Sequence, residues 1–153
     1  MRIDHVSLTL FAWENIPPTS YHAASIQTGG RSALGLLRIR TDTGITGHAF
    51  LGSATHTAEN DGPGLIRFLK PLLMDKDPLD REAINARLWP WTRTVTVRSI
   101  GAVDVALWDI AGQAAGLPIH RLLGTTRHGI GAYASSARLP SIEAYAEEAQ
   151  SFK

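Results

Sequence analysis

The spacing of apolar residues changes after residue 51, and this change limits the folds that the chain can adopt. Near the start, apolar Val6, Leu8 and Leu10 alternate with polar residues, which indicates a half-buried β-strand. After residue 51, apolar residues recur at intervals of three and four, which indicates helices. A group of strands followed by a group of helices predicts an α+β domain in which helices pack on an antiparallel sheet.

Three strands are expected, at residues 5–10, 36–41 and 45–51. The last two are separated by Asp42-Thr43-Gly44, a short hairpin connection in which glycine can adopt a positive φ angle. Residues 14–32, between the first two strands, are rich in Pro, Ser, Thr and Gly. We expect them to form a long irregular connection, which in a compact domain is more often a functional loop than a spacer.

Three helices are expected next. The first covers residues 65–73 with a kink or break at Pro71, and the second opens with Asp77 as N-cap and Pro78 as its first residue. The strongest helical pattern covers residues 98–115 and ends at Gly116. Its expected buried stripe consists of Ile100, Val103, Leu107, Ile110 and Ala114.

The end of the chain has a different pattern. Residues 130–136 predict a short strand, and Ser141 is the expected N-cap of a helix with an apolar stripe made of Ile142, Tyr145, Ala149 and Phe152. We therefore divide the chain into a first domain at residues 1–124 and the start of a second at 125–153. The second part reads as the opening strand and helix of an α/β architecture.

Composition excludes several classes of function. The 153 residues carry a formal net charge of +1, and their basic residues are scattered, unlike the dense basic face of a nucleic-acid-binding protein. The absence of cysteine excludes disulfides, thiolate zinc sites and a cysteine nucleophile. No signal peptide or membrane-spanning run is recognisable, so we expect a cytoplasmic protein without a membrane or nucleic-acid partner.

The residues that suggest chemistry have simpler structural interpretations. His22, His48 and His56 could meet in space, but they lack the short spacing typical of a metal site. Asp104 and Asp109 lie five residues apart and would point about 140° apart on a helix, so they cannot bind one ion together. We expect each of them to make hydrogen bonds at the edge of the helix. The residues alone predict no catalytic site.

A longer motif carries a family resemblance. The string AVDVALWDIAGQAAGLPI at residues 102–119, followed by RLLG at 121–124, resembles the enolase superfamily. It is more closely similar to the branch of mandelate racemase and muconate lactonizing enzyme. TGITG at 43–47, Asp77-Pro78, and AYAS at 132–135 agree with this resemblance in the same order along the chain.

The resemblance implies an N-terminal capping domain, with a three-stranded antiparallel sheet and a helical bundle, followed by the first βα unit of an incomplete TIM-like barrel. The family's three acidic Mg²⁺ ligands and its acid/base residues would lie beyond residue 153. We therefore expect the chain by itself to be inactive, with no catalytic residue and no metal bound. The intact parent would be a Mg²⁺-dependent enzyme that removes the α-proton of a carboxylate, and we expect it to be an acid-sugar dehydratase. A racemase or cycloisomerase of the same branch, or a free-standing binding module, are the alternatives.

In this family, two loops of the capping domain close over the substrate and shape specificity. They match residues 14–32 and 51–57 here. The resemblance therefore implies that the substrate, a small carboxylate such as an acid sugar, is capped by Tyr21, His22, Arg31, Leu51 and His56. Any one of these side chains could instead face only solvent. A homo-oligomeric parent is also expected from the family.

Overall fold

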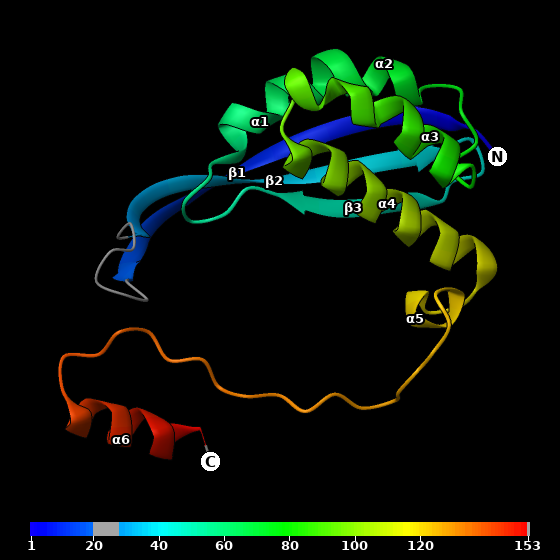
Figure 1. Cartoon of the computed structure of the whole chain (residues 1–153). Helices are drawn as coiled ribbons and strands as arrows, with labels where there is room; N and C mark the ends of the chain where they lie inside the picture. The colour runs from blue at the N-terminus through cyan, green and yellow to red at the C-terminus, as the bar shows by residue number, and fades with distance from the viewer. Residues whose placement is uncertain (20–27, 153) are drawn as a thin grey trace.

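The computed structural model describes residues 1–19 and 28–152 and confirms the α+β architecture. A three-stranded antiparallel sheet has the order β1-β2-β3, and helices α1 to α4 cover one of its faces (Figure 1). The strands are β1 (Ile3–Thr19), β2 (Thr28–Thr41) and β3 (Thr46–Leu51).

The first two strands are longer than the sequence predicts. β1 and β2 remain paired as far as Thr19 and Thr28, so the expectation that residues 14–32 form an irregular connection is wrong at both ends of that range. Asn15 has a positive φ of 57°, and the strand register shifts on both sides of Ile16. Because these irregularities interrupt the alternation of side chains, a period-two pattern does not reveal this part of the ribbon.

The hairpin between β2 and β3 is confirmed. Gly44 has a φ of 88°, a conformation that favours glycine, and its N–H donates to the carbonyl oxygen of Thr41 at 3.0 Å. The N–H of Thr41 donates in turn to the carbonyl oxygen of Ile45 at 2.9 Å. β3 begins at Thr46, one residue after the predicted start.

The helical part begins with three segments in direct succession. They are α1 (Ala58–Gly64), the π-helical segment η1 (Leu65–Leu69) and α2 (Lys70–Leu73). The helix predicted at residues 65–73 begins earlier, at Ala58, and the chain stays helical through Pro71, with a change of helix type just before this proline. The N–H of Lys70 donates to the carbonyl of Leu65, five residues back, and Pro71 has no N–H to continue the ladder.

The remaining helices are α3 (Arg81–Leu88), the 3₁₀ segment η2 (Trp89–Arg93), α4 (Val97–Ala115), α5 (Ile119–Leu122) and α6 (Ile142–Ser151). In the part of the chain that the structure describes, none of the helices combines the length and the apolar character needed to cross a bilayer.

The predicted start of the second helix is wrong. The carboxylate of Asp77 accepts a hydrogen bond from the N–H of Leu79 at 3.0 Å, and its backbone carbonyl accepts one from Asp80 at 3.1 Å. Asp77 and Pro78 therefore form a separate turn, and α3 begins only at Arg81. An aspartate followed by proline suits an isolated turn as well as a helix start, so this signal does not distinguish the two.

Helix α4 confirms the strongest helical prediction. The hydroxyl of Thr96 caps it by accepting from the N–H of Ser99 at 3.3 Å, and Gly116 ends it with a φ of 63°. Four residues of the predicted stripe are buried, namely Ile100, Val103, Leu107 and Ile110. Ala114 is exposed, contrary to the prediction, because it lines an open pocket beside α3.

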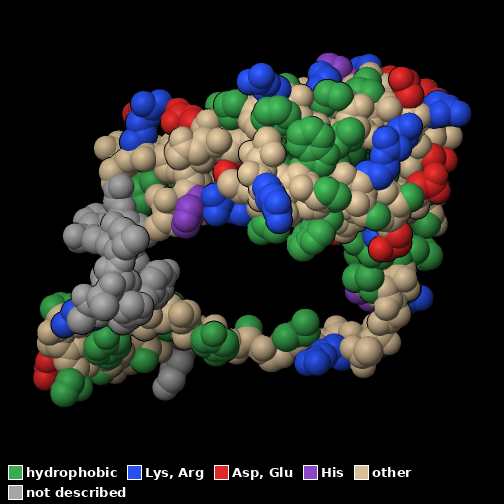
Figure 2. Space-filling view, turned by 45° about the horizontal axis from the view of Figure 1, so that its top comes forward, with side chains coloured by type: hydrophobic (Ala, Val, Ile, Leu, Met, Phe, Trp, Pro, Cys, Tyr) green, Lys and Arg blue, Asp and Glu red, His purple; other side chains and the backbone are tan. Residues whose placement is uncertain are grey.

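The core lies between the helices and the inward side of the sheet. Leu37 and Ile39 of β2 are fully buried there, together with Val103 and Leu107 of α4. On the other side of the sheet, Phe50 of β3 is 71% exposed. Among the described residues, helices therefore cover one side of the sheet, and an open gap separates the body from the end of the chain (Figure 2).

After α5 the chain runs as an extended segment below the sheet before it reaches α6 (Figure 1). The expected strand at 130–136 is not formed, since this segment pairs with no strand among the described residues. Ser141 caps α6 as predicted, by accepting from the N–H of Ala144 at 3.2 Å. The hydroxyl of Tyr145 accepts from the N–H of Leu139 at 3.0 Å, so α6 folds back onto the preceding segment.

Candidate functional site

The expected capping residues that the structure describes lie on β2, β3 and the connection to α1. Arg31 is near the start of β2, Leu51 is the last residue of β3, and His56 lies between β3 and α1. Tyr21 and His22 lie outside the described residues. Arg31, Leu51 and His56 can therefore be placed. Hydrogen bonds between residues next to them show how β2 meets the connection from β3 to α1.

The connection at residues 52–57 is held against β2 by two hydrogen bonds. The hydroxyl of Ser32 donates to the carbonyl oxygen of Ser53 at 2.6 Å. The backbone N–H of Ala33 donates to the hydroxyl of Thr57 at 3.1 Å, and Thr57 is also the N-cap of α1. The two segments that the sequence analysis assigned to capping thus meet at one place.

Inside this connection, Ser53 organises a tight turn. Its hydroxyl accepts from the N–H of Thr55 at 3.3 Å and of His56 at 3.1 Å, while its own N–H donates to the carbonyl of His56 at 2.7 Å. Gly52 enters the turn with a φ of 93°, and a Cβ there would lie 2.8 Å from the carbonyl oxygen of Ala33. Both the dihedral angle and the close approach require glycine.

His56 is exposed at the tip of this turn. Its Nδ1 is hydrogen-bonded to the hydroxyl of Thr55 at 2.9 Å, while Nε2 has no partner among the described residues. The bond to Thr55 orients the ring, and Nε2 can donate to a carboxylate, or can donate to or accept from a hydroxyl group.

Arg31 forms an ion pair with Glu59 of α1 at 3.7 Å. The two side chains are 65% and 51% exposed, and such surface pairs add little to stability. The guanidinium can therefore exchange Glu59 for another carboxylate at small cost, and it can bind that group with two parallel hydrogen bonds.

Leu51 has a different place from the other expected residues. Its side chain is only 2% exposed and belongs to the core. It anchors the start of the 52–57 connection and does not form part of the exposed surface.

The structure describes His48 and Asp109, two of the residues considered for other chemistry, whereas His22 lies outside the described residues. The N–H of His48 donates to the carboxylate of Asp109 at 2.8 Å, and the side chain of Gln113 donates to the carbonyl of Thr46 at 2.8 Å. These bonds cover the free edge of β3 with side chains of α4, which confirms the structural interpretation of Asp109. Within residues 1–19 and 28–152, no three His, Asp or Glu side chains lie close enough to hold a metal ion.

Three residues outside the sequence-based predictions hold the two segments together, namely Ser32, Ser53 and Thr57. Thr57 could have been found as a threonine directly before a helix, with an acidic residue in the first turn. The roles of Ser32 and Ser53 depend on contacts between distant segments, for which the sequence has no local signal.

Comparison with known proteins places the domain in a family. A sequence model of the mandelate racemase / muconate lactonizing enzyme N-terminal domain matches residues 7–124. The chain belongs to this family. The match covers most of the chain. It confirms the resemblance to the mandelate racemase / muconate lactonizing enzyme family that residues 102–124 carry.

One curated relative of this chain is a "D-galactonate dehydratase family member" from Pseudarthrobacter chlorophenolicus. The two are 41% identical over 115 residues, which are 69% of this chain and 27% of the relative. This chain thus spans well under half the length of the relative that it matches.

Two solved structures show the same fold. An enolase-superfamily member from Polaromonas sp. JS666 matches with a TM-score of 0.81 at 24% identity, over 99% of this chain and 41% of that one. A D-glucarate dehydratase from Agrobacterium tumefaciens, complexed with magnesium, matches with a TM-score of 0.63 at 29% identity, over 83% and 33%. Because the first match covers nearly the whole chain, it includes the extended segment and α6.

Proposed function

We propose that this chain is the capping part of a Mg²⁺-dependent dehydratase that acts on a sugar acid. The observation that carries the proposal is the 41% identity to a D-galactonate dehydratase family member over the capping domain. The structural similarity to a D-glucarate dehydratase supports the same class of substrate. Both names refer to polyhydroxylated carboxylates.

The exposed polar groups at the 52–57 connection fit such a substrate. His56 offers one ring nitrogen, and Arg31 offers a guanidinium whose ion pair with Glu59, the one seen among the described residues, is a weak surface contact. The ring nitrogen of His56 suits hydroxyls, and the guanidinium of Arg31 suits a carboxylate. We assign substrate capping to Arg31 and His56, with Leu51 as the buried anchor, and we keep Tyr21 and His22 as further capping candidates.

The residues of this chain determine which part of the dehydration reaction we assign to it. In dehydration of a 2,3-dihydroxy acid, the proton on the carbon next to the carboxylate is removed and the hydroxyl of the neighbouring carbon leaves as water. The resulting enol then becomes a 2-keto-3-deoxy acid. The described residues do not form a metal site, so they do not fit the role of Mg²⁺ ligands, and we assign them no step through the metal. Their part is to bind the polar substrate and limit access of water.

We also propose that residues 1–124 form the capping domain and that residues 125–153 begin a barrel domain that would supply the chemistry. The buried core lies within the first part, between Ile3 and Ile110. In the whole enzyme we expect Mg²⁺ as cofactor, a cytoplasmic location and a homo-oligomer.

The test is to read the gene beyond codon 153 and assay the complete product. We expect an open frame whose product converts D-galactonate, D-glucarate or a related sugar acid to its 2-keto-3-deoxy acid, with loss of activity in EDTA and recovery with Mg²⁺. Exchange of the α-proton in D₂O without loss of water would instead identify a racemase. A stop codon after residue 153 would favour a free-standing binding module.

In the complete enzyme, His56→Ala should lower kcat/KM for the sugar acid about tenfold or more and leave thermal stability nearly unchanged, because the ring is exposed. The control is His120→Ala, which changes another exposed histidine, distant in sequence from the 52–57 connection. Equal effects of the two substitutions would contradict the capping role of His56.

A further inference from the structure

A pocket that the capping role does not use lies where α3, α4 and α5 meet. Its volume is about 410 Å³, within the range of small-molecule sites. It is lined by the turn before α3, the C-terminal half of α4, and α5, through Leu79, Arg81, Trp108, Ala111, Ala114, Ala115 and Leu122. It shares no residue with the 52–57 connection.

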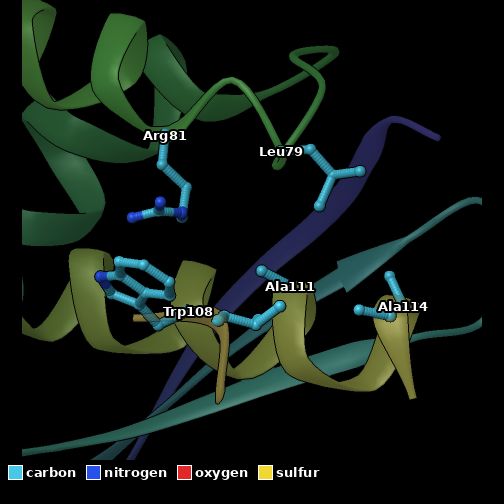
Figure 3. Close-up of a pocket in the computed structure, with 7 residues that line it drawn as sticks. Leu79, Arg81, Trp108, Ala111 and Ala114 are labelled. Atoms are coloured by element: carbon cyan, nitrogen blue, oxygen red, sulfur yellow. The ribbon is translucent and has the colours of Figure 1, made fainter. Parts of the chain in front are cut away.

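The centre of the pocket is a stacked pair of side chains. Arg81, the first residue of α3, reaches toward α4 and lies over the indole of Trp108 (Figure 3). The guanidinium carbon is 3.3 Å from the ring centroid, and the Arg81 side chain is only 18% exposed. Stacking holds the guanidinium in one orientation and leaves the N–H groups at its edge available.

These N–H groups have no close acceptor in the described chain. The nearest ion-pair partner is Glu82, with a distance of 4.0 Å and a side chain that is 92% exposed. By contrast, Arg98 and Arg40 have carboxylate oxygens at 2.9 Å and 3.0 Å. Arg81 is thus a largely buried cation that is oriented but not neutralised, and such a cation favours a carboxylate partner.

The rest of the pocket is apolar. Leu79, Ala111 and Ala114 lie beside the stacked pair, and the alanines leave room over the α4 surface (Figure 3). A sugar acid would place its hydroxyls against these methyl groups without hydrogen bonds, which costs free energy. The apolar walls therefore favour a ligand with an aliphatic group over a sugar acid, the substrate proposed above.

We propose that this pocket binds a carboxylate joined to a compact aliphatic group, with Arg81 holding the carboxylate. The carboxylate can belong to a small free acid or to an acidic side chain of a polypeptide segment with leucine-like neighbours. Both sources have the same chemistry, and the proposal does not depend on the sugar-acid dehydratase function.

The test uses the whole 153-residue chain and two ligands. One is 4-methylpentanoate, with the uncharged 4-methylpentanamide as its control, and the other is N-acetyl-Leu-Glu-Leu-amide, whose sole carboxylate is a side chain. Binding is followed by ¹⁵N NMR through the indole N–H of Trp108, one of four tryptophans, which is assigned with Trp108→Phe.

We expect a saturable shift of the Trp108 signal with the acid or the peptide, and none with the amide. Arg81→Lys keeps the charge but loses the planar pair of donors, so it should weaken binding about tenfold or more. Arg87→Lys, an exposed residue of the same helix, should leave binding unchanged. Tighter binding of the acid identifies a small molecule as the source, and tighter binding of the peptide identifies a polypeptide.

The proposal is overturned if neither ligand gives a saturable shift, if the amide binds as well as the acid, or if Arg81→Lys binds like the unchanged chain. Circular dichroism and thermal melting of each variant show whether it is folded. If Arg81→Lys does not fold, Arg81→Gln replaces it, with the same expectation for binding.

Discussion

At the scale of single residues, the ion pair of Asp61 and Arg98 joins the start of α1 to the start of α4. The Asp61 side chain is 2% exposed and accepts from Nε of Arg98 at 2.9 Å, whereas the Arg98 side chain is 45% exposed. The hydroxyl of Ser99 also donates to the backbone carbonyl of Asp61 at 3.4 Å. Because α1 follows the 52–57 connection directly, this pair fixes the helix on which the connection ends.

Arg98→Met should therefore destabilise the chain by about 3 kcal/mol, because it leaves a buried carboxylate without a cation. The double variant Asp61→Asn/Arg98→Met should recover part of that loss, since no buried charge remains. Urea unfolding of the single and double variants measures both free energies. A double variant that is less stable than Arg98→Met would show that the pair does not act through the buried charge.

Gly47 is a second residue whose identity is constrained by packing, here by the contact between β3 and α4. A Cβ at this position of β3 would collide with the backbone carbonyl of Ala106 in α4 and would lie 2.7 Å from a side-chain carbon of Ile110. β3 and α4 can pack this closely only because residue 47 has no side chain.

We expect Gly47→Ala to lower the free energy of unfolding by about 3 kcal/mol, because the new methyl group meets backbone and not a flexible side chain. The matched control is Gly101→Ala, at an exposed position in α4 with open space for a Cβ. This change should stabilise the chain by about 0.5–1 kcal/mol through helix propensity. Urea unfolding of both variants measures these changes in the free energy of unfolding. Similar changes at the two sites would contradict the close packing of β3 on α4 as the cause.

At the scale of elements, the connection from β3 to α1 depends on the hydroxyl of Ser53. Ser53→Ala removes the acceptor for the N–H groups of Thr55 and His56. We expect faster amide hydrogen exchange at both residues, with a loss of about 1 kcal/mol or less in global stability, since the turn is at the surface. Ser53→Thr keeps the hydroxyl and should retain the protection. Unchanged exchange in Ser53→Ala would mean that backbone bonds alone hold the turn.

The elements also differ in how far the sequence predicts them. The sequence predicts α4 within one residue at its start, because four apolar residues, Ile100, Val103, Leu107 and Ile110, recur at helical spacing and Gly116 is a standard end signal. The sequence does not predict the C-terminal end of β1 or the start of β2, since Asn15 and the register shifts break the alternation. The family motif predicts two capping segments, and their capping role stays a prediction. The bonds that join these segments, from Ser32 to the carbonyl of Ser53 and from Ala33 to Thr57, connect residues more than twenty positions apart and have no local signal in the sequence.

At the scale of the whole molecule, the chain consists of a packed body and an extended end. The core residues lie between Ile3 and Ile110, and no described residue after Gly112 is buried. Ile130 and Tyr133 are 80% and 88% exposed. An unpaired strand segment has free N–H and C=O groups on both edges, so the pattern at 130–136 predicts a strand that forms only beside a neighbour.

Removing residues 125–153 should therefore leave the body intact. We expect the 1–124 chain to melt cooperatively and within about 3 °C of the full chain, because the removed part contributes no buried core side chains. In the full chain, trypsin should cut first after Arg127 and Arg138, which lie in the extended segment, and leave a stable body. Mass spectrometry of the products and calorimetry of both chains provide the measurements. A much lower melting temperature for 1–124, or protection of both arginines in a monomer, would show that the end of the chain is an integral part of the fold.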